Sequence, residues 1–221
     1  MPDPLTTKAR HVLARSRGMI AKTKPPPNIS CEVYCNVLNQ PALNANKDEA
    51  QVLRWGRHNG RFGPMLAAAG ERGLVWLGFI MDDDSAALAQ LAKSWPQSQL
   101  REDHAATKDA VDLALASAPM SLVCPLPLLL RGTPFQIAVW QALLLIPKGA
   151  LVSYQEVAAA VGKPTAVRAT GSAVGANPIA ILIPCHRVIL KSGALHAYGW
   201  GSERKRAIIS SELASELNIS G

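Results

Sequence analysis

The stretch Ile183-Pro184-Cys185-His186-Arg187-Val188 is the part of the chain around which the rest is organised. It follows the apolar run 179–182, which predicts a buried strand that ends just before the cysteine. Thiols react as thiolates, and a free cysteine at pH 7 is only roughly 3% thiolate. A neighbouring base or cation raises that fraction, and His186 and Arg187 come next in sequence. Cys185 is therefore either a nucleophile or an inert thiol beside a turn, and the motif alone leaves both interpretations open.

The composition predicts a globular protein that does not enter a membrane. A chain of 221 residues with 48% hydrophobic content is long enough for one large or two small domains. No apolar run approaches the roughly 20 residues that span a bilayer, and no signal-peptide core follows Met1. The cysteines are scattered, without a disulfide framework, at Cys31, Cys35, Cys124 and Cys185. We therefore expect a soluble, cytoplasmic protein in a reducing compartment.

The net charge of +7 is unevenly distributed along the chain. Residues 1–30 hold six Lys/Arg and one acidic residue, residues 31–128 hold eight against eleven, and residues 129–221 hold nine against four. The part with Cys185 is thus basic and the middle is acidic. A basic half favours a polyanionic partner such as nucleic acid, although charge alone is weak evidence.

The first 51 residues are predicted to be a basic and polar extension that is largely disordered. Pro25-Pro26-Pro27 ends any helix, and residues 36–51 have the composition of a linker. A DNA-contacting arm and a transit peptide are the alternatives. Cys31 and Cys35 have no second Cys/His pair at zinc-finger spacing, so we predict no metal site.

Residues 52–128 are predicted to form a small α/β domain without chemistry of its own. The apolar runs 65–69 and 74–79 flank a Gly-containing turn and indicate a β-hairpin. Asp82-Asp83-Asp84 is interpreted as the start of a helix, where the dipole favours anions, in preference to a metal site. A second helix is expected over 104–118, followed by an extended Pro-containing connector over 119–131.

Residues 129–221 are predicted to form a mostly helical second domain. Thr133-Pro134 starts one helix, and Ser153 with Glu156 forms a capping box at the start of the next. That second helix and a helix over 165–176 are separated by a short Gly-containing turn, which indicates a helix-turn-helix. A last helix is expected over 202–217.

The helix over 165–176 consists almost entirely of small residues, with Arg168 as its one long cation. A helix that reads the major groove projects long polar side chains to base edges, and this one cannot. Small residues let a helix approach a surface closely, either the minor groove of DNA or another helix, and both interpretations stay open. Asn177-Pro178 then turns the chain toward Cys185.

Taken together, these motifs resemble the O6-alkylguanine-DNA alkyltransferases, also called methylated-DNA–protein-cysteine methyltransferases. The matching pieces, in the family's order over about 80 residues, are Phe135 with 138–140, Val152-Ser153-Tyr154, Arg168-Ala169, Asn177-Pro178, 183–188, Tyr198-Gly199-Trp200-Gly201, Arg204-Lys205 and Glu212. The resemblance implies a ribonuclease H-like α/β N-terminal domain followed by a winged helix-turn-helix-like C-terminal domain. The hairpin over 65–79 matches the family's N-terminal domain more loosely.

The resemblance implies direct DNA repair in a single turnover, without a metal or other cofactor. Cys185 would accept the alkyl group irreversibly from O6 of guanine, and O4-alkylthymine is a second possible substrate. His186 would act as a base through a water, Glu212 would orient His186, and Asn177 would be a hinge. The remaining roles are DNA and phosphate contacts by Tyr154, Arg168, Ala169, Ser172 and Ala173, and a guanine pocket made by Tyr198, Gly199 and Val188.

The implied partner is double-stranded DNA, held in the minor groove with little sequence preference by a monomer. An O6-alkyl group lies inside the duplex, so the nucleotide must be flipped out and Arg168 would fill the gap. Two other classes of function remain: a non-reactive sensor that binds alkylated DNA and recruits other repair factors, and a cysteine hydrolase. His196-Ala197 and Thr170 depart from the family pattern, as do residues 1–51.

Overall fold

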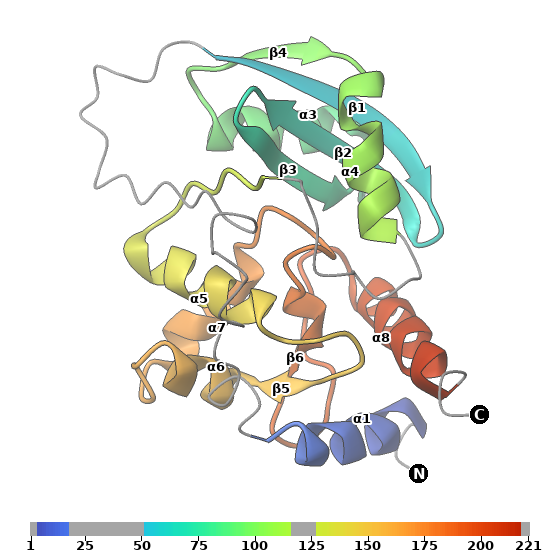
Figure 1. The fold of residues 1–221 in the computed structure, drawn as a ribbon, viewed down its shortest axis with the longest axis vertical. Coiled ribbons are helices and arrows are strands. Elements are labelled where there is room, and N and C mark those ends of the chain that lie inside the picture. Colours follow the sequence, from blue (N-terminus) through green and yellow to red (C-terminus); the bar gives the residue numbers. More distant parts are fainter. Residues whose placement is uncertain (1–3, 18–50, 116–126, 218–221) are drawn as a thin grey trace. The chain divides into compact units, whose positions relative to one another are not determined.

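The structure, a computed structural model, describes residues 4–17, 51–115 and 127–217, which divide between two compact units (Figure 1). The first, here called the α/β unit, contains residues 51–115, 127–134 and 178–180. The second, here the cysteine unit, contains 4–17, 135–177 and 181–217. The chain therefore leaves the cysteine unit for three residues between Asn177 and Ile181.

The α/β unit is built on a four-stranded mixed sheet in the order β3-β2-β1-β4. Its strands are β1 (Val52–Gly60), β2 (Gly63–Gly70), β3 (Gly73–Phe79) and β4 (Gln99–Glu102). The predicted hairpin over 65–79 is confirmed as the antiparallel pair β2–β3. Strands β1 and β4 had no sequence signal because polar and charged residues interrupt β1, and β4 has only four residues.

Helices α3 (Asp84–Ser94) and α4 (Ala105–Leu115) cover opposite faces of this sheet (Figure 1). The Asp83 carboxylate caps α3 by accepting a hydrogen bond of 2.7 Å from Ala86 N, which confirms a helix start at the aspartates. α4 crosses β1 so closely that a Cβ on Gly56 would lie 2.7 Å from Thr107 Oγ1. Gly56 therefore has to lack a side chain at this crossing.

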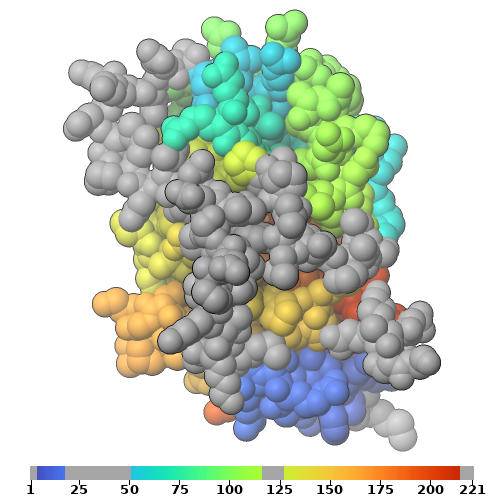
Figure 2. Space-filling model, viewed as in Figure 1, coloured from blue at the N-terminus to red at the C-terminus, as the bar shows by residue number. Residues whose placement is uncertain are grey.

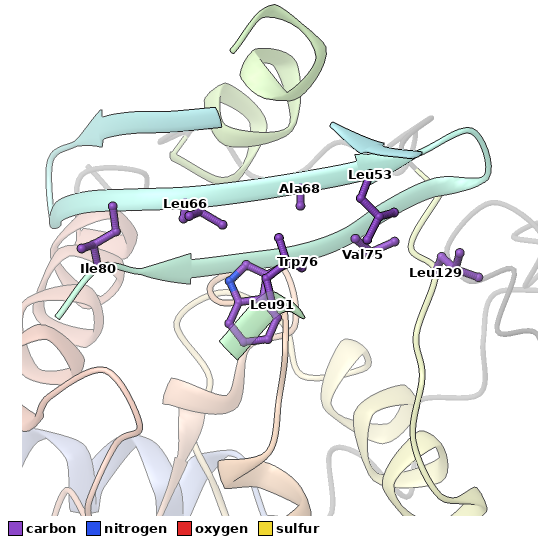
Figure 3. Packing of buried hydrophobic residues seen from close by; sticks show 8 residues of the cluster. All are labelled: Leu53, Leu66, Ala68, Val75, Trp76, Ile80, Leu91 and Leu129. Atoms are coloured by element: carbon purple, nitrogen blue, oxygen red, sulfur yellow. The ribbon is translucent and has the colours of Figure 1, made fainter. Parts of the chain in front are cut away.

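The core of the α/β unit lies between the sheet and α3 (Figure 3). The indole of Trp76 and the side chain of Leu91, from α3, meet over the sheet. The other members of this cluster are Leu53, Leu66, Ala68, Val75, Ile80 and Leu129. Leu129 belongs to the predicted connector, whose residue Leu128 lies parallel to Leu74 of β3.

The cysteine unit is mostly helical, as expected. Its elements are α1 (Pro4–Arg15), α5 (Pro134–Leu144), β5 (Val152–Ser153), α6 (Tyr154–Ala160), α7 (Val167–Gly175), the 3₁₀ helix η2 (Cys185–Arg187), β6 (Val188–Ile189) and α8 (Ser202–Leu217). The capping box is confirmed, because Ser153 Oγ accepts from Glu156 N and Ser153 N donates to the Glu156 carboxylate. β5 and β6 pair in parallel. No helix in the described ranges is both long and apolar enough to cross a membrane.

Helix α1 is a departure from the disordered extension expected over 1–51. Ala9, Val12 and Leu13 pack into a core with side chains of β6, α8 and the residue before β5. Their spacing of three and four residues gives α1 one apolar stripe, but the stripe is short and is surrounded by cations. The stripe is therefore a weak signal in the sequence. The triple proline, Cys31, Cys35 and Cys124 lie outside the described residues.

The predicted strand over 179–182 is wrong. Only Ile179 forms a bridge, with Leu77 of β3, and the chain then turns, with Ile181 at φ 66°. Ile179, Ala180 and Leu182 are nevertheless buried. A short apolar run reports burial and does not by itself distinguish a strand from a buried turn.

The α3 side of the core gives a stability prediction. We expect Leu91→Ala to lower the free energy of unfolding by about 2–5 kcal/mol, because Leu91 is fully buried and its removal leaves a cavity. Val52→Ala is the matched control, since Val52 is 42% exposed. Chemical denaturation followed by circular dichroism measures both variants. Equal effects of the two substitutions would contradict the assigned core.

Candidate active site

Cys185 begins η2 and is only 3% exposed. The Asn177 side-chain amide donates to Cys185 Sγ at 3.0 Å and to Ile183 O at 2.9 Å. Asn177 itself directly follows α7 and its C-cap, and it is buried. One side chain thus connects the end of α7 to the thiol and to the turn before it.

Burial raises the pKa of the Cys185 thiol, because a thiolate loses hydration in an apolar site. The Asn177 hydrogen bond and the charge of Lys205 lower the thiol pKa, but the effect of burial is larger. Cys185 is thus protonated at neutral pH before a substrate arrives. A reaction at this sulfur needs a group that takes the proton.

His186 is placed to be such a group. Its Nε2 lies 3.1 Å from Glu212 Oε1, and both side chains are buried. Burial lowers the pKa of His186, although Glu212 opposes this, so the ring is neutral at pH 7. A neutral ring that donates from Nε2 to the carboxylate has an unprotonated Nδ1. Within the described part of the chain, Nδ1 is buried without a hydrogen-bond partner, so it is free to accept a proton.

Glu212 is held by Arg187 as well as by His186. Arg187 Nε donates to Glu212 Oε2 at 3.0 Å, and a second guanidinium nitrogen donates to Oε1 at 2.7 Å. Burial alone would raise the pKa of Glu212, but the hydrogen bonds of His186 and Arg187 and the charge of Arg187 hold it well below its usual range. The carboxylate therefore stays ionised and keeps its orientation toward His186.

Lys205 is a buried cation beside this cluster, with 1% of its surface exposed. Its Nζ donates to Val188 O at 2.7 Å. Burial lowers its pKa to about 8, while the Cys185 charge works against that shift. A positive charge so close favours the thiolate form of Cys185.

Two tyrosines line the surroundings of the sulfur. Burial and the charge of Cys185 raise the pKa of Tyr154 to about 12, and burial raises that of Tyr198 well above 10. Both phenols therefore keep their protons at neutral pH and can donate hydrogen bonds. The buried Tyr198 hydroxyl also interacts with the Cys185 thiol and lowers the pKa of that thiol. The Tyr154 ring packs edge-on against His196, with centroids 5.9 Å apart.

Helix α5 holds helix α7 in place, because Trp140 Nε1 of α5 donates a hydrogen bond of 2.8 Å to Ala173 O of α7. Arg168, Ala169 and Ser172 lie on the exposed face of α7, whereas Ala173 is buried on the inner face. The DNA contact expected of Ala173 stays a prediction, at a residue that is 2% exposed. Arg168 has no side-chain partner among the described residues.

The expected pocket residues Val188 and Gly199 are in different situations. Val188 N–H donates to Cys185 O and its carbonyl accepts from Lys205, which leaves the second lone pair of that carbonyl for a ligand. Gly199 is exposed, and a Cβ placed on it would lie 3.7 Å from Gly175 O of α7. No group of three or more His, Cys, Asp or Glu among the residues described here is arranged to hold a metal ion.

Comparison with known proteins shows the relationship. A family model described as "6-O-methylguanine DNA methyltransferase, DNA binding domain" matches residues 134–214. The chain resembles the crystal structure of Mycobacterium tuberculosis OGT in complex with DNA, with a TM-score of 0.60 and 35% identity over 73% of this chain and 94% of that one. The chain belongs to the O6-alkylguanine-DNA alkyltransferase family.

Two curated relatives extend the similarity. The regulatory protein ada of Salmonella typhimurium is 43% identical over 70% of this chain and 44% of its own length. A methylated-DNA--protein-cysteine methyltransferase of Mycobacterium bovis is 58% identical over 38% of this chain and 50% of its own length. The chain thus spans about half the length of the curated relatives that it matches.

Sequence reasoning on the alkyltransferase motifs missed Arg187 and Lys205 as parts of the site. Arg187 was noted only as a neighbour of Cys185, because its two bonds to Glu212 join residues 25 positions apart. Lys205 has a local signal: with Ile208, Ile209 and Glu212 it occupies the positions i, i+3, i+4 and i+7 of one face of α8. A lysine on an apolar stripe is a candidate for burial.

The buried Lys205 of the candidate site gives a pH prediction. The pKa of Lys205 is about 8 in the folded chain against an ordinary value of 10.5, so between these values the unfolded chain binds more protons. The unfolding free energy should therefore rise with pH over that interval, relative to Lys205→Met, by up to about 3 kcal/mol. Below pH 8 both states are protonated and the difference between the two proteins is constant.

Denaturant unfolding from neutral pH to pH 10.5 measures this difference. Both proteins carry Cys185→Ala, because Cys185 interacts electrostatically with Lys205 and titrates in the alkaline range itself. A difference that is flat, or that falls as the pH rises, would show that Lys205 is hydrated.

Proposed function

We propose that the protein repairs DNA by transferring the alkyl group of an O6-alkylguanine, in double-stranded DNA, irreversibly to the sulfur of Cys185. The observation that carries the proposal is a buried thiol that accepts a hydrogen bond from the Asn177 amide and is followed directly in sequence by a buried base, His186, oriented by Glu212. The family relationship supports the same reaction, since relatives bear the name methylated-DNA--protein-cysteine methyltransferase. O4-alkylthymine is a second substrate that the same chemistry allows.

The proton moves first in this proposal. The thiol proton passes through a water to His186 Nδ1, while Glu212 holds the Nε2–H side of the ring and stabilises the imidazolium. Direct transfer is not needed, and a bridging water fits the buried, unpaired Nδ1. Lys205 stabilises the thiolate that results.

The alkyl group is then transferred in a single displacement. The thiolate attacks the alkyl carbon, an S–C bond forms, and the C–O6 bond breaks with its electrons going to the guanine. The guanine takes up a proton from water, which balances the thiol proton that His186 accepted and then releases to water. The phenol of Tyr154, which stays protonated at neutral pH, is a hydrogen-bond donor to the guanine. This displacement at carbon requires neither a metal nor an organic cofactor.

The thioether product accounts for a single turnover. No residue of the site offers chemistry that cleaves a thioether, so each molecule acts once. The alternative, a sensor that binds alkylated DNA without reacting, needs no acceptor thiol. A buried thiol bonded by Asn177, with the unpaired Nδ1 of His186 on the next residue, therefore favours transfer over sensing.

The DNA contact in this proposal is made by α7 in the minor groove. α6 and α7 act as a helix-turn-helix in a winged arrangement, and the small exposed residues Ala169 and Ser172 allow close approach without reading sequence. The alkylated nucleotide is flipped out of the stack toward Tyr198 and Gly199, and Arg168 takes its place. Asn177 acts as the hinge between α7 and the thiol.

The proposal also covers the organisation of the chain. Residues 52–128 form a ribonuclease H-like α/β domain and residues 129–221 the alkyltransferase and DNA-binding domain, to which α1 adds. The protein acts as a monomer, because a single Cys185 completes the reaction. It acts in the cytoplasm, where a reducing environment keeps the thiol free.

The proposed reaction predicts one added methyl group per protein. After incubation with duplex DNA containing O6-methylguanine, peptide mass spectrometry should place the methyl on Cys185, and thiol reductants should not remove it. Cys185→Ala should accept no methyl group and still bind the DNA. Tight binding by the unaltered protein with an unmodified Cys185 would instead establish the sensor.

Arg168→Ala tests nucleotide flipping. Arg168 is exposed on α7. Without its side chain, the free-energy cost of unstacking the nucleotide, a few kcal/mol, is no longer offset, so we expect repair of duplex DNA to be about 10²-fold slower. The rate with the free base O6-benzylguanine should change little, because no stack has to be opened. Single-turnover kinetics on both substrates measures the two rates, with Ser172→Ala on the same helix face as the control. Equal slowing on both substrates would contradict the flipping role.

A further inference from the structure

Lys8 and Arg15 lie two turns apart on one exposed side of helix α1, and Arg17 follows the helix. Residues 4–17 contain four Lys/Arg and no acidic residue. Lys8, Arg15 and Arg17 are exposed, and none of the three has an ion pair or hydrogen bond with the described residues. Figure 2 shows side chains of α1, in blue, at the surface of the molecule.

Helix α1 is fixed to the cysteine unit by specific contacts. Arg10 Nε donates to Ser192 O at 3.0 Å, and Ser16 Oγ accepts from Leu151 N at 3.4 Å. Gly193 has a φ of +88°, and a Cβ on it would lie 2.8 Å from Arg10 Cβ, so the loop approaches α1 backbone to backbone. The cations of α1 therefore have a defined place on the cysteine unit.

The loop that contacts α1 also reaches the candidate active site. Four residues after Ser192, the His196 ring packs against Tyr154, and a Cβ on Gly171 of α7 would lie 3.9 Å from the Tyr154 ring. Four residues span at most about 14 Å of extended chain. With the Arg10–Ser192 hydrogen bond and the His196 side chain added, Arg10 lies within roughly 25 Å of the His196–Tyr154 pair beside α7.

We propose that Lys8, Arg15 and Arg17 form a second contact for duplex DNA and bind backbone phosphates that flank the damaged nucleotide. The inference rests on the proposed function, because it takes α7 as the primary DNA contact. Along B-DNA, 25 Å corresponds to about seven base pairs, a distance over which a bound duplex still extends. Unpaired cations beside a phosphate backbone gain affinity by releasing counterions.

The sequence distribution of charge supports DNA as the occupant of this surface. Basic residues are in excess in residues 1–30 and 129–221, which supply the described cysteine unit, and acidic residues are in excess in 31–128. A phosphate backbone is therefore attracted to the unit that holds both α1 and α7. The contact is independent of sequence, as repair of lesions at any position requires.

The experiment compares two triple variants, each in a Cys185→Ala background so that binding is measured without reaction. One carries Lys8→Gln, Arg15→Gln and Arg17→Gln, and leaves the docking residue Arg10 in place. The control carries Arg72→Gln, Lys93→Gln and Arg101→Gln, three exposed cations of the α/β unit with no described partner. Fluorescence anisotropy gives the dissociation constant for a duplex of about 20 base pairs with one O6-methylguanine, over a series of salt concentrations.

The α1 variant should bind about tenfold or more weakly at 0.1 M salt, and its slope of log K against log salt should flatten by about 2 to 3, whereas the control should match the parent. On a hairpin-closed duplex with only about three base pairs on each side of the lesion, the α1 variant and the parent should bind alike. Its methyl transfer to Cys185 from a free alkylguanine base, measured with the thiol restored, should be unchanged.

An unchanged slope in the α1 variant, or equal losses in the two triple variants, would overturn the inference. The first would leave α1 to some other acidic partner and the second would show a general effect of charge. Failure of the proposed function looks different: the parent itself would then neither bind the methylated duplex nor accept a methyl group, and the inference would fall with it.

Discussion

The structure of the candidate site depends on one buried carboxylate, that of Glu212. An ionised carboxylate inside a protein is strongly destabilising unless its oxygens are paired and hydrogen-bonded. Arg187 supplies two hydrogen bonds and a positive charge, and His186 supplies a third bond. Because Arg187 neutralises the charge, the imidazole can stay neutral and still have its Nε2–H fixed by Glu212. The Arg187–Glu212 ion pair therefore fixes the orientation of His186, although His186 itself carries no charge.

A second constraint connects this cluster to helix α7, the proposed DNA contact. The Asn177 amide is shared between the Ile183 carbonyl and the Cys185 sulfur, and Asn177 lies just beyond the C-cap of α7. The carbonyl of Ala173, one turn earlier, is held by Trp140. A shift of α7 by even a fraction of a turn would thus break a hydrogen bond to the nucleophile. The proposed DNA binding and the proposed chemistry are thus coupled through three buried side chains, those of Trp140, Asn177 and Cys185.

How much the sequence predicts depends on whether the signal is local. The helices α5 to α8 and the capping box of Ser153 are written in contiguous patterns, and they were predicted close to their observed limits. The turn at Ile181 was not, because an apolar run carries no information on φ. The pairing of Arg187 with Glu212 lies between distant residues, so no spacing rule detects it. The family resemblance supplied Glu212, and only the fold supplied its second partner.

Helix α8 shows why such sites combine local and distant information. Its inner face places Lys205 and Glu212 two turns apart, with Ile208 and Ile209 between them. The apolar pair anchors the helix in the core, and the ionisable groups on either side of this pair are thereby buried. Each needs a partner there, and each finds one on the segment that follows Cys185: Val188 O for the lysine, Arg187 and His186 for the glutamate. The burial of α8 and the electrostatics at the thiol are therefore one structural requirement, since the same hydrophobic contacts that stabilise the helix fix the charges around the sulfur.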